Sequence, residues 1–225
     1  MTQRTTPTPS FERDALVPDK SHYNAKYLLG GRMFSFAHQV EHVLSFDPRQ
    51  VLEIGPGPRI VTHALRAAGV DVKTLDVEPT LRPDILGSVT DIPLEDGAVD
   101  VIVCCQVLEH LPFDQFVPAL RELRRVARVG AVISLPDITP AYFVLVNLPL
   151  LHRRAVAFSR RLRNPPAQPP RNRHERDGHY WEIGVEGFPA ARVRGGMRQA
   201  GWRIRREFRT NECPFHHFFV LERAV

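Results

Sequence analysis

The sequence predicts an α/β fold built on a doubly wound, mostly parallel β-sheet with helices on both faces. Strand-like apolar runs alternate with segments of helical periodicity between residues 31 and 137. The run at 99–105 is typical of a central parallel strand. Two further strand patterns, at 203–209 and 215–222, are joined by a short turn and predict a C-terminal antiparallel hairpin. The chain has 225 residues, of which 43% are hydrophobic, and this is enough for one large domain with its own core.

The elements of the first half follow from local patterns. Residues 1–30 are expected to form an N-terminal arm, of which the first twenty or so are polar, proline-rich and mobile. Apolar residues at helical spacing predict helices over 31–45 and 59–68, closed by Asp47-Pro48 and by Gly69. Short apolar or alternating runs predict strands at 50–54, 71–75 and about 85–89.

The second half continues the alternation and then changes character. We expect a strand at 99–105, a helix over 113–128 and a strand at 131–135. Residues 140–163 are apolar and then basic, and we expect a helix packed on the sheet with a solvated arginine face. Residues 164–176 hold four prolines and predict a loop, and a helix is expected over 189–200. With the two final strands, the sheet has seven strands in a single domain spanning 31–225.

Charge and cysteine content narrow the function classes. The formal net charge of +5 divides into −4 for residues 1–150 and +9 for residues 151–225. A general nucleic-acid binder usually carries its basic face on the main domain, so this division disfavours nucleic acid as a partner. Three cysteines cannot form a disulfide framework, which fits a reducing, cytoplasmic location. No apolar segment resembles a secretory signal or is long enough to cross a bilayer.

The most informative motif is the strand that enters a glycine turn at Val51–Pro58. Gly55 and Gly57 allow a ligand to approach the backbone, and the carboxyl end of a parallel strand is where doubly wound sheets bind ligands. Asp76 ends the next strand and can accept hydrogen bonds from ribose hydroxyls. A dinucleotide site is the alternative, but its third glycine is replaced by Ile60. Glu53 would repel a pyrophosphate, so the charge pattern favours a sulfonium or amino-acid group.

Together with Asp91-Ile92-Pro93-Leu94, Val99–Ile102 and Cys105–Leu111, this motif resembles the class I S-adenosylmethionine-dependent methyltransferases, in particular the methyltransferase type 11 group. The resemblance covers residues 45–137 and implies a Rossmann-like sheet, methyltransferase activity and S-adenosyl-L-methionine as cofactor. It also implies which residues bind each part of the cofactor. Glu53, Gly55, Pro56 and Gly57 would contact the methionine end, and Asp76 and Val77 the ribose. Asp91 and Ile92 would contact the adenine, and Gln106 would lie near the transferred methyl. Many members have a further glycine where this chain has Pro58-Arg59, so the following helix is expected to begin differently.

Candidates for the acceptor side follow from the demands of methyl transfer. A hydroxyl acceptor of high pKa needs a general base, for which His110 and His179 are candidates, and Tyr180 and Trp181 are candidates for contact with the acceptor. Each has a structural alternative: His110 as part of a common helix start, and the cluster at 177–182 as a packed loop anchor. His216 and His217 face opposite sides of a strand, which favours core or surface roles. No spacing resembles a zinc site, so no metal is expected.

The sequence therefore predicts a methyltransferase acting on a small molecule, with the basic insertion at about 138–186 setting the choice of acceptor. Its apolar and arginine-rich character suits a lid over an anionic or amphiphilic acceptor. A helix resting on an anionic membrane surface is a further alternative, so peripheral membrane contact stays open. Two other functions also stay open: an RNA-binding methyltransferase, and a cofactor-binding protein without catalytic activity. The oligomeric state is not predicted.

Overall fold

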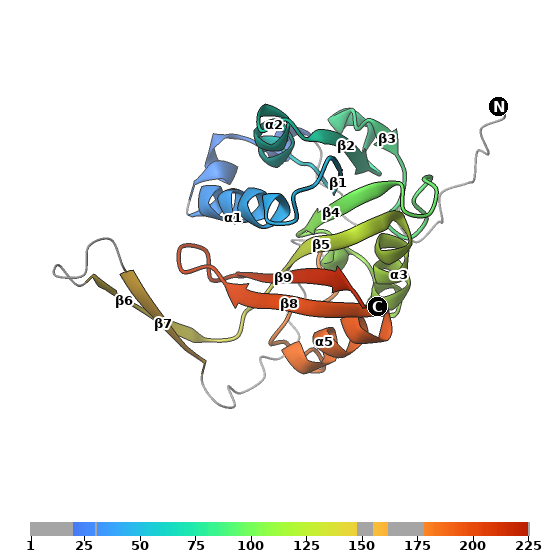
Figure 1. Ribbon diagram of the computed structural model, residues 1–225. Coiled ribbons are helices and arrows are strands. Elements are labelled where there is room, and N and C mark those ends of the chain that lie inside the picture. Colours follow the sequence, from blue (N-terminus) through green and yellow to red (C-terminus); the bar gives the residue numbers. More distant parts are fainter. Residues whose placement is uncertain (1–19, 30, 148–154, 162–177, 225) are drawn as a thin grey trace, which may run out of the picture.

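A computed structural model of the protein describes residues 20–29, 31–147, 155–161 and 178–224. Its central element is a seven-stranded sheet in the order β3-β2-β1-β4-β5-β9-β8 (Figure 1). The first five strands in that order are parallel, and β9 and β8 are antiparallel to their neighbours. This confirms the predicted doubly wound sheet with a C-terminal hairpin. The strands are β1 (Gln50–Ile54), β2 (Asp71–Asp76), β3 (Ile85–Leu86), β4 (Val99–Cys105), β5 (Ala127–Pro136), β8 (Trp202–Arg209) and β9 (His216–Arg223).

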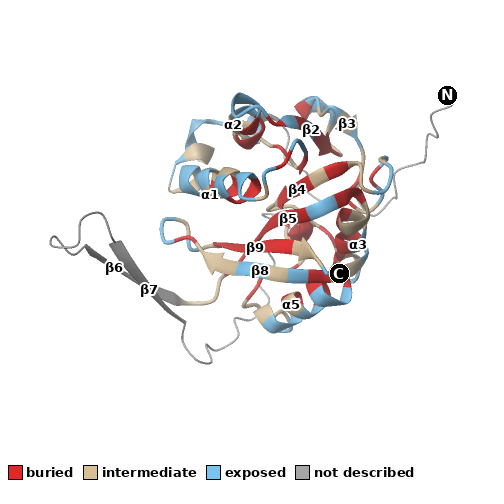
Figure 2. Ribbon diagram, viewed as in Figure 1, coloured by how far each residue is buried: buried red, intermediate tan, exposed pale blue. Residues whose placement is uncertain are grey.

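Helices cover both faces of the sheet, and each face has its own apolar core. The helices α1 (Arg32–Leu44) and α2 (Ile60–Ala67) pack on one face, and α3 (Phe116–Val126) and α5 (Ala190–Gln199) on the other (Figure 1). Alternate residues of the central strands divide between the cores: Val101 and Val103 face α1 and α2, whereas Ile102 and Cys104 face α3. β4, β5 and β9 are therefore mostly buried (Figure 2).

The helix expected over 113–128 is shorter than predicted. Residues Phe113–Gln115 form a 3-10 turn, and α3 ends at Val126. Ala127 already has extended backbone angles and pairs with Val99 of β4, so β5 begins four residues earlier than the predicted strand at 131. The last apolar position of the predicted helix, Val126, is also the last residue of α3, and pairing with β4 extends the backbone from Ala127 onward.

The prediction of a helix over residues 140–163 is wrong. The structure has two antiparallel strands there, β6 (Ala141–Asn147) and β7 (Ala155–Arg161), which pair with each other in a separate two-stranded sheet (Figure 1). A short apolar run does not distinguish a helix from a strand by periodicity, and this run is rich in aromatic and β-branched residues, which favour strands. The predicted loop at 164–176 and the first part of the arm lie outside the described residues. In the described part of the chain, no helix has the length and apolarity needed to span a bilayer.

The end of β5 is tied to the last part of the predicted insertion. His217 contacts Asp137 through Nδ1 at 2.8 Å and Glu207 through Nε2 at 2.9 Å. Asp137 forms a parallel bridge with Ile183, and Ile183 is fully buried. Residues 178–184 therefore belong to the packed core beside the carboxyl end of the sheet, which places His179 and Glu182 there.

Candidate functional site

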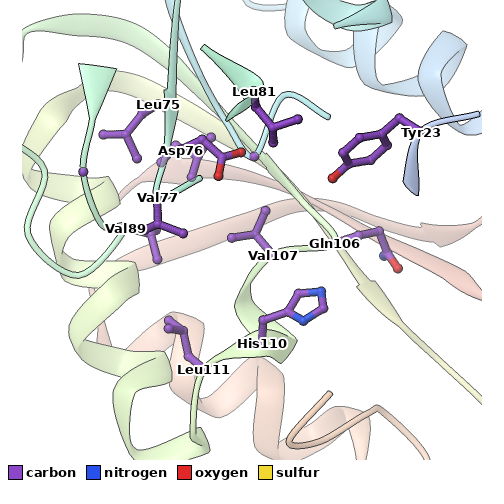
Figure 3. Close-up of a pocket in the computed structure, with 13 residues that line it drawn as sticks. Tyr23, Leu75, Asp76, Val77, Leu81, Val89, Gln106, Val107, His110 and Leu111 are labelled. Carbon is purple, nitrogen blue, oxygen red and sulfur yellow. The ribbon is translucent and has the colours of Figure 1, made fainter. Parts of the chain in front are cut away.

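A cleft of two adjoining pockets lies at the carboxyl ends of β1, β2 and β4. Tyr23, Ile54, Gly55 and Gln106 line both pockets. Figure 3 shows the first pocket, in which the Asp76 carboxylate points into the hollow. Its other lining residues are Leu75, Val77, Leu81, Gly87, Val89, Val107, His110 and Leu111. The second pocket is more polar, and its other lining residues are Tyr27, Arg32, Phe36, Gln39, Glu53, Pro56, Gly57, Pro58, Val103, Cys105 and His216.

The glycine turn after β1 forms the floor shared by the pockets. Gly55 has a φ of +67°, and a Cβ atom there would lie 2.5 Å from Cγ2 of Val107. Gly57 has a φ of +47°, and its Cβ atom would lie 2.8 Å from the ring of Tyr23. Both positions require glycine for backbone conformation and for space, so the turn brings bare backbone against the cleft.

The departure from the glycine pattern at Arg59 leaves the turn intact. Arg59 takes the left-handed conformation, with φ 60° and ψ 23°, which glycine adopts more easily, and α2 begins at the next residue. Its guanidinium donates a hydrogen bond of 2.9 Å to the carbonyl of Leu81 and another to the carbonyl of Arg82. These bonds tie the start of α2 to the loop after β2, and they offset the cost of the unusual backbone conformation.

Asp76 is the buried carboxylate at the end of β2. It is 8% exposed, and its Oδ1 accepts a hydrogen bond of 3.0 Å from the backbone N–H of Glu78. Burial raises the pKa of this carboxyl above its usual value, while the backbone N–H groups of Glu78 and Val77 lower it. Since a carboxylate can accept several hydrogen bonds, Asp76 keeps acceptor capacity toward the pocket.

Glu53 lies at the inner wall of the second pocket. It is 4% exposed, and its Oε2 accepts a hydrogen bond from the hydroxyl of Thr62 on α2. Burial raises the pKa of Glu53 to about 7, against smaller opposing effects of Thr62 and Arg59. The side chain therefore titrates near neutral pH, and a cation in the pocket would favour its ionised form.

Asp91 and Ile92, which the resemblance implies at the adenine, are not among the residues that line the two pockets. Asp91 is exposed, and Ile92 is buried in the core with its N–H donated to Glu122 at 3.0 Å. Gly87 and Val89, just after β3, line the first pocket instead. Contact of Asp91 and Ile92 with the adenine stays a prediction from the resemblance.

The N-terminal segment contributes to the cleft, which the sequence pattern does not predict. Residues Lys20–His22 and Ala25–Leu28 form two 3-10 turns that bring Tyr23 and Tyr27 over the second pocket. Their rings meet edge to face at 5.0 Å, and Arg32 stacks on Tyr27 at 4.1 Å. Burial raises the pKa of both phenols, so both are neutral at physiological pH. The polar, proline-rich sequence around this segment predicts only an N-terminal arm.

His110 and His179 come together, although they lie far apart in the sequence. Their ring centroids are 4.9 Å apart, and His110 lines the first pocket. Nδ1 of His110 lies 3.2 Å from the carbonyl oxygen of Gly178, and Nδ1 of His179 lies 2.7 Å from Oε1 of the buried Glu182. Glu109 is completely buried beside them, and burial raises its pKa to about 7.

Trp181 and Tyr180 line neither pocket. Trp181 is 2% exposed, packs against Phe113 and Phe116, and donates its indole N–H to the carbonyl of Leu111 at 3.1 Å. Tyr180 packs against the same core and donates its backbone N–H to the carbonyl of Glu109 at 2.9 Å. This geometry favours the alternative of a packed loop anchor, because both residues hold the loop that carries His179 against the turn that carries His110.

His216, at the back of the second pocket, should make the fold acid-labile. It is buried, its Nδ1 lies 2.6 Å from the Ser35 hydroxyl, and burial, aided by Arg32, lowers its pKa to about 3. Since the unfolded chain binds this proton near pH 6.5, stability is lost as pH falls below that value. Between pH 7 and 5 this residue should lower the free energy of unfolding by about 2 kcal/mol.

Urea denaturation at several pH values measures this effect. The loss between pH 7 and 5 should be about 2 kcal/mol smaller in His216→Asn than in the wild type. His63→Asn, at an exposed position on α2, is the matched control and should keep the wild-type slope. Parallel pH profiles for wild type and His216→Asn would contradict the assignment.

Comparisons with known proteins agree with this architecture. Residues 52–135 match the family model described as a methyltransferase domain. No curated protein matches the chain. The match begins in β1 and ends in β5, so it contains the glycine turn, Asp76, Gln106 and His110.

Solved structures share the fold at low sequence identity. One is 1,6-didemethyltoxoflavin-N1-methyltransferase from Burkholderia thailandensis, with TM-score 0.59 and 12% identity over 100% of this chain and 94% of that one. Another is magnesium protoporphyrin IX methyltransferase from Synechocystis with bound S-adenosylmethionine, with TM-score 0.56 and 14% identity over 86% and 80%. The CcbJ methyltransferase from Streptomyces caelestis has TM-score 0.57 and 17% identity over 93% and 94%. At these identities the likeness concerns the fold.

Proposed function

We propose that this chain is a class I S-adenosylmethionine-dependent methyltransferase. From this premise, the reaction we propose is transfer of the cofactor's methyl group to a small-molecule acceptor. The cleft at the carboxyl ends of β1, β2 and β4 carries this proposal, because it joins a glycine cradle to two buried carboxylates. The toxoflavin and protoporphyrin enzymes named above support a small acceptor. We also propose that residues 31–225 form one catalytic domain.

The residues of the cleft fit the proposed cofactor. The cofactor combines a cationic methionine end with a ribose and an apolar base. Glu53 would face the cationic end, Asp76 would accept hydrogen bonds from the ribose, and Val89 and Leu81 would flank the base. Pro56, Gly57, Val77 and Gln106 complete the proposed binding set. Gly55 and Gly57 have no Cβ atom, so Val107 and Tyr23 pack against their backbone, and both glycines line the cleft beside these side chains.

His110 and His179 are the proposed catalytic residues. The bound cofactor supplies an electrophilic methyl group, and the protein has to hold the acceptor in line with it and exclude water. His110 lines the first pocket, and His179, oriented by Glu182, contacts it from the loop held by Trp181. We propose that the acceptor lies against this pair. The arginines of the insertion, together with the charge of +9 in the last third, favour an anionic or amphiphilic acceptor.

Calorimetry and labelled turnover test the proposed function. Titration of the protein with S-adenosylmethionine and with its demethylated product should show binding of one molecule per chain. Absence of binding by either at high micromolar concentration, with the protein folded by circular dichroism, would refute the proposed cofactor. Mass spectrometry of a metabolite extract incubated with enzyme and methyl-labelled cofactor should then identify the methylated acceptor.

The affinity for the cofactor should rise with pH through the titration of Glu53. In the free protein this carboxyl has a pKa of about 7, and a bound cation favours its ionised form. Raising the pH from 6 to 8 should therefore increase affinity by about tenfold, with most of the change below pH 7. Calorimetric titrations in buffers of different ionisation enthalpy would measure both the affinity and the proton release.

Glu53→Gln is the control for this pH dependence. It keeps the shape of the side chain and an acceptor for the Thr62 hydroxyl, but it does not titrate. Its pH profile contains only the titration of the cofactor itself, so the difference between the two profiles isolates Glu53. The same profile for variant and wild type would show that Glu53 does not meet the cationic end.

A further inference from the structure

The strongest unused feature of the molecule is the buried carboxylate of Glu109. Its side chain is fully buried on the 3-10 turn Leu108–His110 that follows β4. Neither carboxylate oxygen has a hydrogen-bond partner among the described residues. A buried charge without a partner is strongly unfavourable, and a neutral carboxyl would still need an acceptor for its proton. The position of Glu109 is therefore explained best by a cation that the side chain meets there.

Two histidines present ring nitrogens to the same place. One carboxylate oxygen of Glu109 and one ring nitrogen each of His110 and His179 lie within 4.8 Å of one another. Metal ions are bound by imidazole and carboxylate at about 2.0–2.2 Å, so small side-chain rotations would close this cluster on an ion. Sequence spacing could not reveal the cluster, because His179 arrives from a distant loop.

The contacts of the two histidines match those of metal ligands. A ligating histidine usually directs its other ring nitrogen to a carboxylate or a backbone carbonyl, which fixes the orientation of the ring. Here Nδ1 of His110 faces the carbonyl of Gly178 at 3.2 Å, and Nδ1 of His179 faces Oε1 of Glu182 at 2.7 Å. A tautomer that donates from Nδ1 carries its lone pair on Nε2.

We propose that Glu109, His110 and His179 bind one divalent transition-metal ion of the zinc class beside the cofactor cleft. Two imidazoles and one carboxylate suit borderline ions such as Zn²⁺ and Co²⁺ better than Mg²⁺, which prefers oxygen ligands. Three protein ligands leave a coordination position for water or for an oxygen of the acceptor. His110 also lines the cofactor cleft, so the ion would polarise an acceptor hydroxyl or carboxylate there. This last role rests on the proposed function, whereas ion binding itself does not.

A second group of potential ligands provides a matched control. His38, Glu41 and His42 lie on α1, with Nδ1 of His38 3.4 Å from Glu41. The Glu41 side chain is 65% exposed, so water satisfies it without an ion. Glu41→Gln and Glu109→Gln thus make the same chemical change at an exposed and at a buried carboxylate.

The test is calorimetric titration of the chelator-treated full chain with Zn²⁺ and with Co²⁺, without cofactor or acceptor. The wild type should bind one ion at this site, and Co²⁺ should show visible absorption bands shifted from those of the aqueous ion. Glu109→Gln should weaken binding by at least about tenfold, and Glu41→Gln should leave the tight site unchanged. His179→Asn, on the other segment, should give the same loss if Glu109→Gln does not fold.

Three results would overturn the site: no binding of either ion to the wild type, wild-type affinity in both Glu109→Gln and His179→Asn, or loss of the tight site in Glu41→Gln. Titration with S-adenosylmethionine in the same preparations separates this outcome from the proposed function. A protein that binds the cofactor but neither ion would refute the metal site alone. A protein that binds an ion but no cofactor would refute the proposed methyl transfer alone.

Discussion

Replacement of Asp76 with alanine is expected to weaken the binding of S-adenosylmethionine by about 10- to 100-fold, because hydrogen bonds to a charged group contribute about 1.5–3 kcal/mol. Asp76 is almost completely buried, and its carboxylate points into the first pocket (Figure 3). The variant loses an acceptor that water cannot replace well in an apolar hollow. Isothermal titration calorimetry of folded protein measures the change in affinity directly.

Glu78→Gln is the control for this substitution. Glu78 lies two residues further along, carries the same charge and lines neither described pocket, and its Oε1 accepts a hydrogen bond from the backbone of Thr80. Its affinity for the cofactor should stay close to that of the wild type. If Asp76→Ala and Glu78→Gln bind equally well, the ribose lies elsewhere and the placement of the cofactor in this cleft is wrong.

Replacement of Trp181 with alanine is expected to lower the free energy of unfolding by about 3–5 kcal/mol. The indole is 2% exposed and packs among Phe113, Phe116 and Phe188. Its removal leaves a cavity and an unpaired carbonyl at Leu111. Chemical denaturation, followed by a probe other than tryptophan fluorescence, would measure the loss.

Trp181→Phe separates packing from hydrogen bonding. It fills most of the space but cannot donate to Leu111, so the loss should be only about 1–2 kcal/mol. If Trp181 instead faced the acceptor, both variants would be nearly as stable as the wild type and would lose activity alone. A loss below 1 kcal/mol in Trp181→Ala would contradict the role of Trp181 as a packed anchor.

The sheet was predictable because its strands are uniform in chemistry. Residues 50–54 and 99–105 are apolar runs that are buried on both faces, and the structure confirms both ranges. The prediction of a helix over residues 140–163 was wrong because a short run of apolar residues fits a helix or a strand. Only tertiary context decides between the two. The end of α3 was predicted two residues too late, because the sequence pattern does not show that Ala127 pairs with Val99 of the neighbouring strand.

The candidate site divides along similar lines. Gly55, Gly57 and Asp76 sit at strand ends, where a local motif and the topology of the sheet together predict position. Tyr23 lines the cleft from a segment without apolar periodicity, so no local pattern predicts its position there. Glu109 is a charged residue in a common sequence context, and its complete burial depends on contacts made by residues 178–182. Contacts between residues so far apart in the sequence cannot be predicted from local sequence patterns.

The N-terminal turn has a consequence for the timing of catalysis. Tyr23 lines both halves of the cleft, and its ring stands against the backbone of Gly57. A ligand that fills both halves of the cleft therefore lies against this ring. In the proposed reaction, a movement of Lys20–Leu28 would open the cleft, and the stability of this turn would then influence the rate at which the demethylated product is exchanged for new cofactor.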